Sequence, residues 1–187
     1  MIHANISNDS LAVLINESNI KILDEVKYED PLINKIGGIE INPLYSMVHS
    51  EDKFSFSGTV SFYPKSQNAE IAFPFSKKTN TDDFFQIFDG EATTVNIDAQ
   101  YRYFLGKYRK GTYIMAGLRY SDRDEQNSII SLNYNKTGIS FGVGYRIFAL
   151  NGLYWGCSIY YGKYYWGSDD GPSTFMNLEF FKFGKTF

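Results

Sequence analysis

The chain has 187 residues and a formal charge of −3 at pH 7, from 18 Lys and Arg against 21 Asp and Glu. This length predicts one domain, or one domain with a short appendage, and the weak charge argues against a nucleic-acid-binding protein. The single cysteine, Cys157, excludes an internal disulfide and a metal site built from several cysteines.

The hydropathy of the chain excludes a membrane-spanning helix. No stretch approaches the roughly 18 apolar residues that such a helix needs. Residence in a membrane would therefore require a closed β-barrel, the other structure that satisfies its backbone in lipid. Aromatic residues make up 18% of the chain, and interfacial aromatic girdles of transmembrane barrels explain such an excess. No signal peptide is visible after Met1, so we expect the chain to begin at or near a cleavage site of an exported protein.

Residues 1–35 differ in composition from the rest and are predicted to form an N-terminal arm, irregular or partly helical. A short helical turn with Leu11 and Leu14 follows Asn8-Asp9-Ser10, which has residues that cap helices. The segment Asp24–Asp30 is mostly charged, and Pro31 ends it. Such an arm packs on the barrel, enters its lumen or binds a partner, and the alternative is a loosely ordered leader.

From Gly37 onward, apolar and polar residues alternate in eight segments, as in β-strands with one apolar and one polar face. The pattern in Thr94–Leu105 breaks only at Phe104. The last segment has no clean face, and a bulge at an unknown position would repair it. The predicted strands are Gly38–Val48, Lys53–Tyr63, Ala69–Ser76, Thr94–Leu105, Thr112–Tyr120, Ile139–Phe148, Leu153–Gly162 and Thr174–Phe187.

Two structures fit this alternation. In a soluble protein the apolar face would be the core, whereas in a membrane barrel it faces lipid and the polar face lines the lumen. The connections favour the membrane barrel, because turns at 64–68, 106–111 and 149–152 are shorter and less charged than most connections at the other end. Those other connections are residues 49–52, 77–91, 121–128 and 166–172. We therefore predict an all-β fold: an eight-stranded antiparallel up-and-down transmembrane barrel over residues 36–187.

The chain ends in NLEFFKFGKTF, which resembles the closing strand of bacterial outer-membrane barrel proteins. Phe181, Phe183 and Phe187 fit that pattern, whereas Glu179 and Lys185 depart from it. The segments GIEINPLYSM, AEIAFPF, YRYFLG and GYRIFALNGLYWG resemble a family of small, eight-stranded proteobacterial outer-membrane barrels. The resemblance implies the barrel fold, removal of a signal peptide, location in the outer membrane of a Gram-negative bacterium, and contact with membrane lipid and lipopolysaccharide. It implies no activity.

Seven polar residues fall on the predicted inner face. The interior of an eight-stranded barrel is just wide enough to be filled by side chains, and buried charges there must be paired. We therefore predict an interlocked polar network that plugs the lumen, with an ion or solute path as the alternative. The seven residues are Glu40, Asn42, Asp98, Gln100, Arg102, Arg119 and Arg146.

No catalytic residue, cofactor or metal site is predicted. The alternative is a lipid A-modifying enzyme, for which His49-Ser50-Glu51 supplies suitable residue types in a position better explained as a solvated loop. The only other histidine is His3, so a histidine metal site is not expected. A third hypothesis is a barrel that binds a small apolar ligand inside.

The predicted function is therefore a structural or interaction protein that contacts a protein partner through its outer loops or its arm. The candidate interaction loop is an apolar cluster in the longest connection, and exposed apolar clusters usually have a reason. Three roles are open to it: folding over the barrel mouth, which we expect first, insertion in the outer leaflet, or contact with a partner. The cluster consists of Phe84, Phe85, Ile87 and Phe88.

Overall fold

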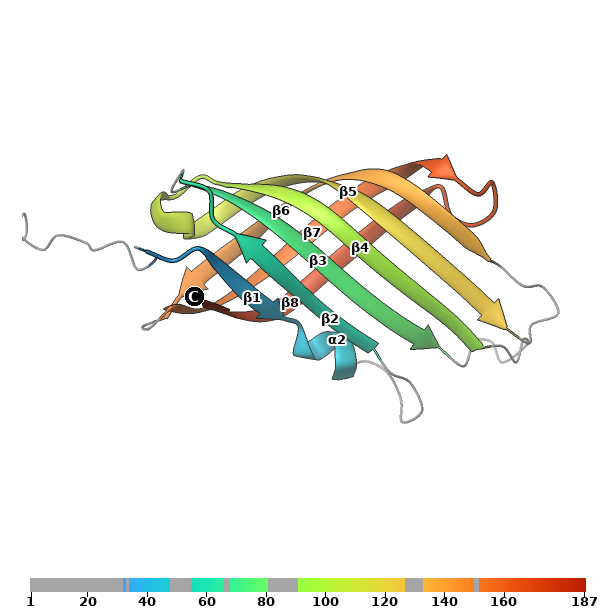
Figure 1. Ribbon diagram of the computed structural model, residues 1–187, viewed down its shortest axis with the longest axis horizontal. Helices are drawn as coiled ribbons and strands as arrows, with labels where there is room; N and C mark the ends of the chain where they lie inside the picture. Colours follow the sequence, from blue (N-terminus) through green and yellow to red (C-terminus); the bar gives the residue numbers. More distant parts are fainter. Residues whose placement is uncertain are drawn as a thin grey trace, which may run out of the picture. The chain divides into compact units, whose positions relative to one another are not determined.

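The computed structural model describes residues 32, 34–47, 55–65, 68–80, 91–126, 133–149 and 152–187. Each strand runs antiparallel to the next, and the first pairs with the last, so the sheet closes into a barrel (Figure 1). This confirms the predicted eight-stranded up-and-down fold. The strands are β1 (Gly37–Ile41), β2 (Ser55–Phe62), β3 (Ala69–Asn80), β4 (Glu91–Phe104), β5 (Gly111–Gln126), β6 (Tyr134–Phe148), β7 (Leu153–Gly167) and β8 (Thr174–Thr186).

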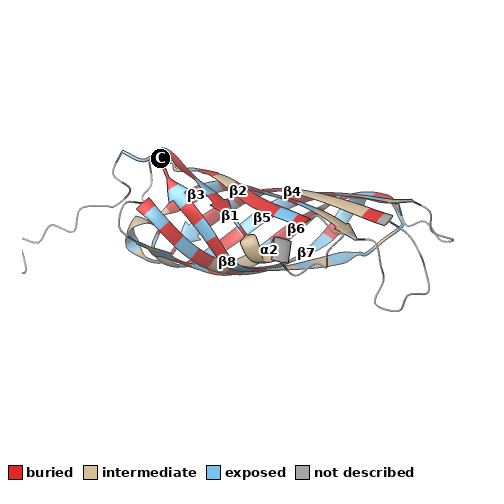
Figure 2. Cartoon of the chain, turned by 90° about the horizontal axis from the view of Figure 1, so that it is seen from below, coloured by how far each residue is buried: buried red, intermediate tan, exposed pale blue. Residues whose placement is uncertain are grey.

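The apolar face of the barrel points outward. On β4, Ile97 and Tyr101 are exposed whereas Asp98, Gln100 and Arg102 are buried, and Figure 2 shows the same alternation along the other strands. The interior is therefore the polar side. This contradicts the hypothesis of a barrel that binds an apolar ligand inside, because that hypothesis needs the apolar face of β4 to point inward.

The outward apolar residues form a belt around the barrel. The belt runs over 97–105 at the end of β4, 114–120 on β5 and 153–161 on β7. These lengths are close to the roughly 9–11 residues with which a tilted β-strand crosses a bilayer. Among the described residues, no helix is long and apolar enough to cross a membrane.

Several strands extend beyond the belt, further than predicted. β3 continues to Asn80 and β5 to Gln126. The predicted loops 77–91 and 121–128 therefore begin as paired strands. Strand pairing continues there because the hydrogen-bond ladder between backbones needs an extended chain but no apolar side chains. For example, Thr79 pairs with Thr93, and their hydroxyl oxygens are 3.3 Å apart.

The prediction of a strand from Gly38 to Val48 is wrong beyond Ile41. The chain turns there into a short helix, α2 (Pro43–Met47), which contacts β2 and β8 (Figure 1). Pro43 is the physical reason, because proline has no N–H for the ladder and is favoured at the first position of a helix. As a result β1 pairs with β8 over only four residues, from Gly38 to Ile41.

A β-bulge in β8 resolves the lack of a clean face in the last strand. Ser158 of β7 pairs with Glu179 and Gly156 pairs with Lys182, so Cys157 stands opposite two residues, Phe180 and Phe181. Both phenylalanines face outward, and Phe181 has a φ of 55°. The bulge therefore turns Glu179 and Lys182, three residues apart, to the same inner face.

Some predictions lie outside the described residues. They are the arm up to residue 31, the segment His49-Ser50-Glu51 and the cluster Phe84, Phe85, Ile87 and Phe88. The division of the chain into an arm over 1–35 and a barrel over 36–187 also stays a prediction.

The lipid-facing wall predicts the effect of a charge at its centre. Val143 is 49% exposed in the middle of the apolar stretch of β6, so Val143→Arg should destabilise the barrel in lipid vesicles by about 2–4 kcal/mol. Guanidinium unfolding in vesicles measures this change. The control Val143→Thr keeps the shape of the side chain and replaces one methyl group by an uncharged hydroxyl, and an Arg variant as stable as this control would contradict a lipid-facing wall.

Candidate functional site

Buried polar side chains line the inside of the barrel, and the structure places all seven predicted lumen residues among them. None of the seven is more than 5% exposed. Asn42 follows β1, and the other six lie on β1, β4, β5 and β6. They do not form one group: the structure divides most of them between two clusters at different heights in the lumen.

The first cluster is built on two carboxylates and two guanidinium groups. Arg102 Nη1 lies 3.1 Å from Glu40 Oε1 and 3.0 Å from Glu70 Oε1. Arg146 Nη2 lies 2.5 Å from Glu40 Oε1, and its Nη1 lies 2.5 Å from Glu70 Oε2. Each arginine therefore bridges both carboxylates. These residues come from β1, β3, β4 and β6, of which only β3 and β4 are neighbours in the sheet, so the cluster joins separate walls of the barrel.

Glu70 is a central member of this cluster that the sequence analysis missed. It is fully buried, and besides both arginines it accepts a hydrogen bond of 2.8 Å from the Ser61 hydroxyl. The signal was present in the sequence: Ile71 and Phe73 face outward, so the period of two places Glu70 inward.

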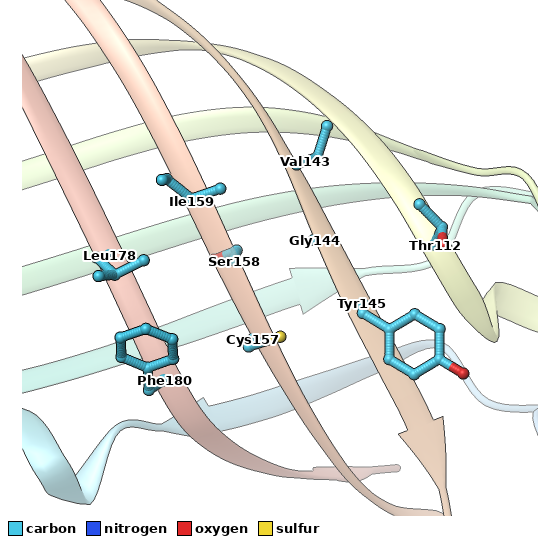
Figure 3. A pocket seen from close by; sticks show the side chains of 9 residues that line it. All are labelled: Thr112, Val143, Gly144, Tyr145, Cys157, Ser158, Ile159, Leu178 and Phe180. Atoms are coloured by element: carbon cyan, nitrogen blue, oxygen red, sulfur yellow. The ribbon is translucent and has the colours of Figure 1, made fainter.

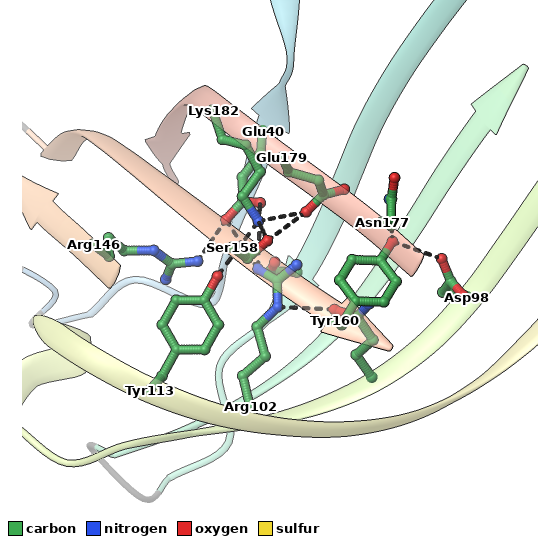
Figure 4. A network of polar contacts seen from close by, with 12 residues as sticks. Glu40, Asp98, Arg102, Tyr113, Arg146, Ser158, Tyr160, Asn177, Glu179 and Lys182 are labelled. Atoms are coloured by element: carbon green, nitrogen blue, oxygen red, sulfur yellow. Dashed lines mark hydrogen bonds and ion pairs between the residues drawn. The ribbon is translucent and has the colours of Figure 1, made fainter. Parts of the chain in front are cut away.

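The bulge in β8 adds a third carboxylate and a third cation to the cluster (Figure 4). Lys182 Nζ lies 2.9 Å from Glu179 Oε2 and 3.5 Å from Glu40 Oε2. The Ser158 hydroxyl donates to Glu179 at 2.7 Å and accepts from Lys182 at 3.0 Å. Sequence reasoning could not find this pair, because in a regular strand residues three apart face opposite sides.

The second cluster lies farther from the end of the barrel where β1 begins and β8 ends. Arg119 Nε and Nη2 donate to Asp98 Oδ1 and Oδ2, each at 2.7 Å, which is the bidentate geometry of strong guanidinium–carboxylate pairs. The Tyr160 hydroxyl accepts from Arg119 Nη2 at 2.7 Å and from Asn177 Nδ2 at 2.6 Å, and contacts Asp98 Oδ2 at 3.3 Å. Four different strands therefore meet at one phenol.

Aromatic rings fill the space beside the guanidinium groups. Phe104, the one break in the alternation of β4, is fully buried, with its ring centroid 4.8 Å from that of Tyr113. The Arg146 guanidinium carbon lies 5.0 Å from the Phe104 centroid and 4.4 Å from that of Tyr154. These contacts are favourable cation–π geometries.

The two clusters together carry no net charge. Four described carboxylates face four cations at ion-pair distance: Glu40, Glu70, Asp98 and Glu179 with Arg102, Arg119, Arg146 and Lys182. Two further buried cations lie toward the ends of the barrel and donate to backbone carbonyls. Arg109 Nε donates to Ala69 O at 2.7 Å and Lys136 Nζ to Pro172 O at 3.1 Å.

A groove of about 290 Å³ lies on the outside of the barrel (Figure 3). Its walls are apolar side chains such as Val143, Ile159 and Leu178, and the small Cys157 lies between them. Cys157 is a free thiol in a partly buried position on the outward face. The groove therefore belongs to the apolar belt and not to the polar lumen.

The described residues show no catalytic constellation. Where side chains are placed, no three His, Cys, Asp or Glu residues are grouped so that they could hold a metal ion. The lipid-active alternative depends on His49, which lies outside the described residues, so it stays a prediction.

Comparison with solved structures finds barrels of the same kind. The chain is similar to the N-terminal β-barrel domain of Pseudomonas aeruginosa OprF, with a TM-score of 0.53 and 16% identity, covering 82% of this chain and 98% of that domain. It is also similar to the outer membrane protein Ail of Yersinia pestis, with a TM-score of 0.50 and 16% identity, covering 82% and 100%. No protein-family model and no curated protein matches the chain.

These similarities confirm the sequence-based assignment at the level of fold. The chain is a small β-barrel of the outer-membrane type, eight-stranded and antiparallel throughout. At 16% identity the likeness extends to the path of the backbone, and the lumen clusters are features of this chain's own side chains.

Removing one charge from the first cluster should be costly. Glu70→Gln leaves Arg102 and Arg146 with one shared carboxylate fewer in a buried site, so we expect a loss of about 3 kcal/mol in unfolding free energy. Guanidinium titration in lipid vesicles measures it. Asp122→Asn, at an exposed carboxylate on β5, is the matched control and should stay within about 0.5 kcal/mol of the parent. Equal stability of the two variants would contradict the cluster.

A double-mutant cycle tests the pair made by the bulge. If Lys182 Nζ and Glu179 share the 2.9 Å contact, the cycle of Lys182→Met and Glu179→Gln should give a coupling energy of at least about 1 kcal/mol. The control cycle combines Glu179→Gln with Lys163→Met, which changes an exposed lysine on β7. Its coupling energy should be near zero. A regular β8 without a bulge would give no coupling in either cycle.

Proposed function

We propose that the protein is an outer-membrane β-barrel whose lumen is closed by ion pairs and which acts as a structural or interaction protein. One observation carries the proposal: an apolar exterior surrounds an interior of buried, mutually paired charges. That arrangement is inverted relative to a water-soluble domain.

The exterior supports residence in a membrane. Large apolar side chains are exposed on neighbouring strands, among them Ile97, Leu118, Phe141 and Ile159, with exposed fractions between 42% and 65%. A water-soluble monomer rarely exposes a contiguous apolar patch of more than a few hundred Å². In a bilayer the same side chains lie in the hydrocarbon, where exposure has no cost.

The first cluster supports a closed lumen. Arg102 and Arg146 cross the interior to reach carboxylates on β1 and β3, and neither arginine is more than 1% exposed. An ion could pass the first cluster only if these ion pairs separated. Separation is costly, because it leaves buried charges without a partner. We therefore favour a closed barrel over the alternative of an ion or solute path.

If the lumen is closed, the function depends on the outer wall, the loops and the N-terminal arm. In this proposal the outer membrane lipid and lipopolysaccharide surround the wall, and a protein partner binds the outer loops, with Phe84, Phe85, Ile87 and Phe88 as the candidate contact, or the N-terminal arm. The apolar character of that cluster within a long connection supports the assignment.

Conductance of the refolded chain tests the closed lumen. In planar bilayers the parent chain should give no steady current, because in this proposal the buried ion pairs of the first cluster close the lumen. A variant that removes the cluster without changing net charge, E40A/E70A/R102A/R146A, should give resolved single-channel currents.

Gel mobility with and without boiling shows whether each form is a folded barrel before its conductance is compared. V143A, which shortens a lipid-facing residue of the wall, should remain closed like the parent. A steady current through the parent chain would overturn the closed lumen, and a monodisperse monomer in buffer without detergent would overturn the membrane barrel.

A further inference from the structure

The two ends of the barrel differ in charge. The end where β1 begins and β8 finishes, at the left of Figure 1, carries five exposed lysines and, among its described residues, no exposed Asp or Glu side chain. The exposed residues toward the other end are mixed in charge and include Asp122, Asp124, Lys77 and Lys163. We call the five lysines the lysine collar: Lys35, Lys65, Lys107, Lys110 and Lys185.

The lysine collar begins where the apolar belt stops. Ile36, 69% exposed, is next to Lys35, and Leu105, 64% exposed, lies two residues before Lys107. Lys185 is on the outward face of β8 and pairs with Ile39 on one side and Leu153 on the other. A lysine in such a place covers apolar surface with its methylene chain and carries its ammonium group to the edge of the hydrocarbon.

A buried arginine holds the turns that carry the collar. Arg109 belongs to the turn η1 (Lys107–Arg109) between β4 and β5, and its side chain reaches the neighbouring turn between β2 and β3. Its Nη2 donates to Pro64 O at 2.7 Å, and its guanidinium carbon lies 4.6 Å from the Tyr63 ring centroid. The two turns that present Lys65, Lys107 and Lys110 are therefore fixed against each other.

We infer that the lysine collar binds the anionic headgroups of the phospholipid leaflet at this end of the barrel. The inference rests on the proposed function, because it requires that the apolar belt lies in a bilayer. Basic residues next to a membrane segment attract anionic lipid over about one Debye length, roughly 8 Å at physiological salt. A leaflet fits better than a soluble anionic polymer, because the lysines follow the edge of the belt around several strands and do not gather on one face.

The two tryptophans of the chain provide a reporter for each end. Trp155 is 41% exposed and pairs with Phe183, close to Lys185, whereas Trp166 is 58% exposed and pairs with Thr137 toward the other end. The variant W166F keeps only the reporter near the collar, and W155F keeps only the distant one. Each full-length chain is refolded into vesicles that contain either brominated phosphatidylglycerol or brominated phosphatidylcholine, whose bromines quench nearby tryptophan.

We expect Trp155 to show at least about a threefold preference for the anionic over the zwitterionic quencher at low salt, and Trp166 to show about equal quenching. Replacing all five collar lysines by Gln should remove the preference at Trp155. The matched control replaces Lys77 and Lys163 by Gln and should leave it unchanged. All variants keep residues 1–34, because Asp24–Asp30 holds four acidic residues and one lysine.

Salt provides a second measurement that needs no variant in the collar: 1 M salt should reduce the preference at Trp155 to near one, because the Debye length falls to about 3 Å. Equal preference at both reporters, or a preference at Trp155 that survives the five substitutions or the salt, would overturn the inference. So would binding of a soluble anionic polysaccharide without lipid preference. If neither brominated lipid quenches Trp155, the barrel does not lie in the bilayer, and the proposed function itself fails.

Discussion

Compensation of charge inside a closed wall is the constraint on which this barrel depends. A carboxylate removed from water in a narrow lumen must have a cation and hydrogen-bond donors in contact. Glu40 and Glu70 meet this condition by sharing Arg102 and Arg146. Such a network gains little stability over apolar packing, but breaking one partner is costly. Its effect is therefore to fix the relative positions of β1, β3, β4 and β6.

Bulges supply side-chain positions that a regular sheet cannot. In a regular strand the face of each residue is set by the parity of its number. The bulge opposite Cys157 places Phe180 and Phe181 together on the lipid side, and Glu179 and Lys182 together in the lumen. A second register shift lies in β7: Thr137 pairs with Trp166 and Gly138 pairs with Tyr164. As a result Tyr165 and Trp166 are both exposed. Both irregularities put two aromatic rings side by side on the outer wall.

The sequence predicts the barrel wall well, because the wall requires only that apolar and polar residues alternate along each strand. That rule predicted the eight strands and gave Glu40, Asp98 and Arg102 their inward positions, and it also applied to Glu70, where it was not used. It could not locate Glu179 and Lys182, since a bulge depends on how β7 and β8 pair across their whole length. It also failed after Ile41, where the missing N–H of Pro43 outweighs a continuing apolar pattern.

The neutral lumen has a consequence for the field around the molecule. Because four carboxylates balance four cations inside the described lumen, the two clusters add no net charge along the barrel axis. One further buried cation lies toward each end, Arg109 at one and Lys136 at the other, so the charge difference between the ends comes from exposed residues at the rims. Among the described residues, one rim exposes lysines without exposed acidic side chains, and the other exposes residues of both signs. Because the buried pairs cancel each other, the exposed residues of each rim dominate the interaction of that end with a charged membrane surface.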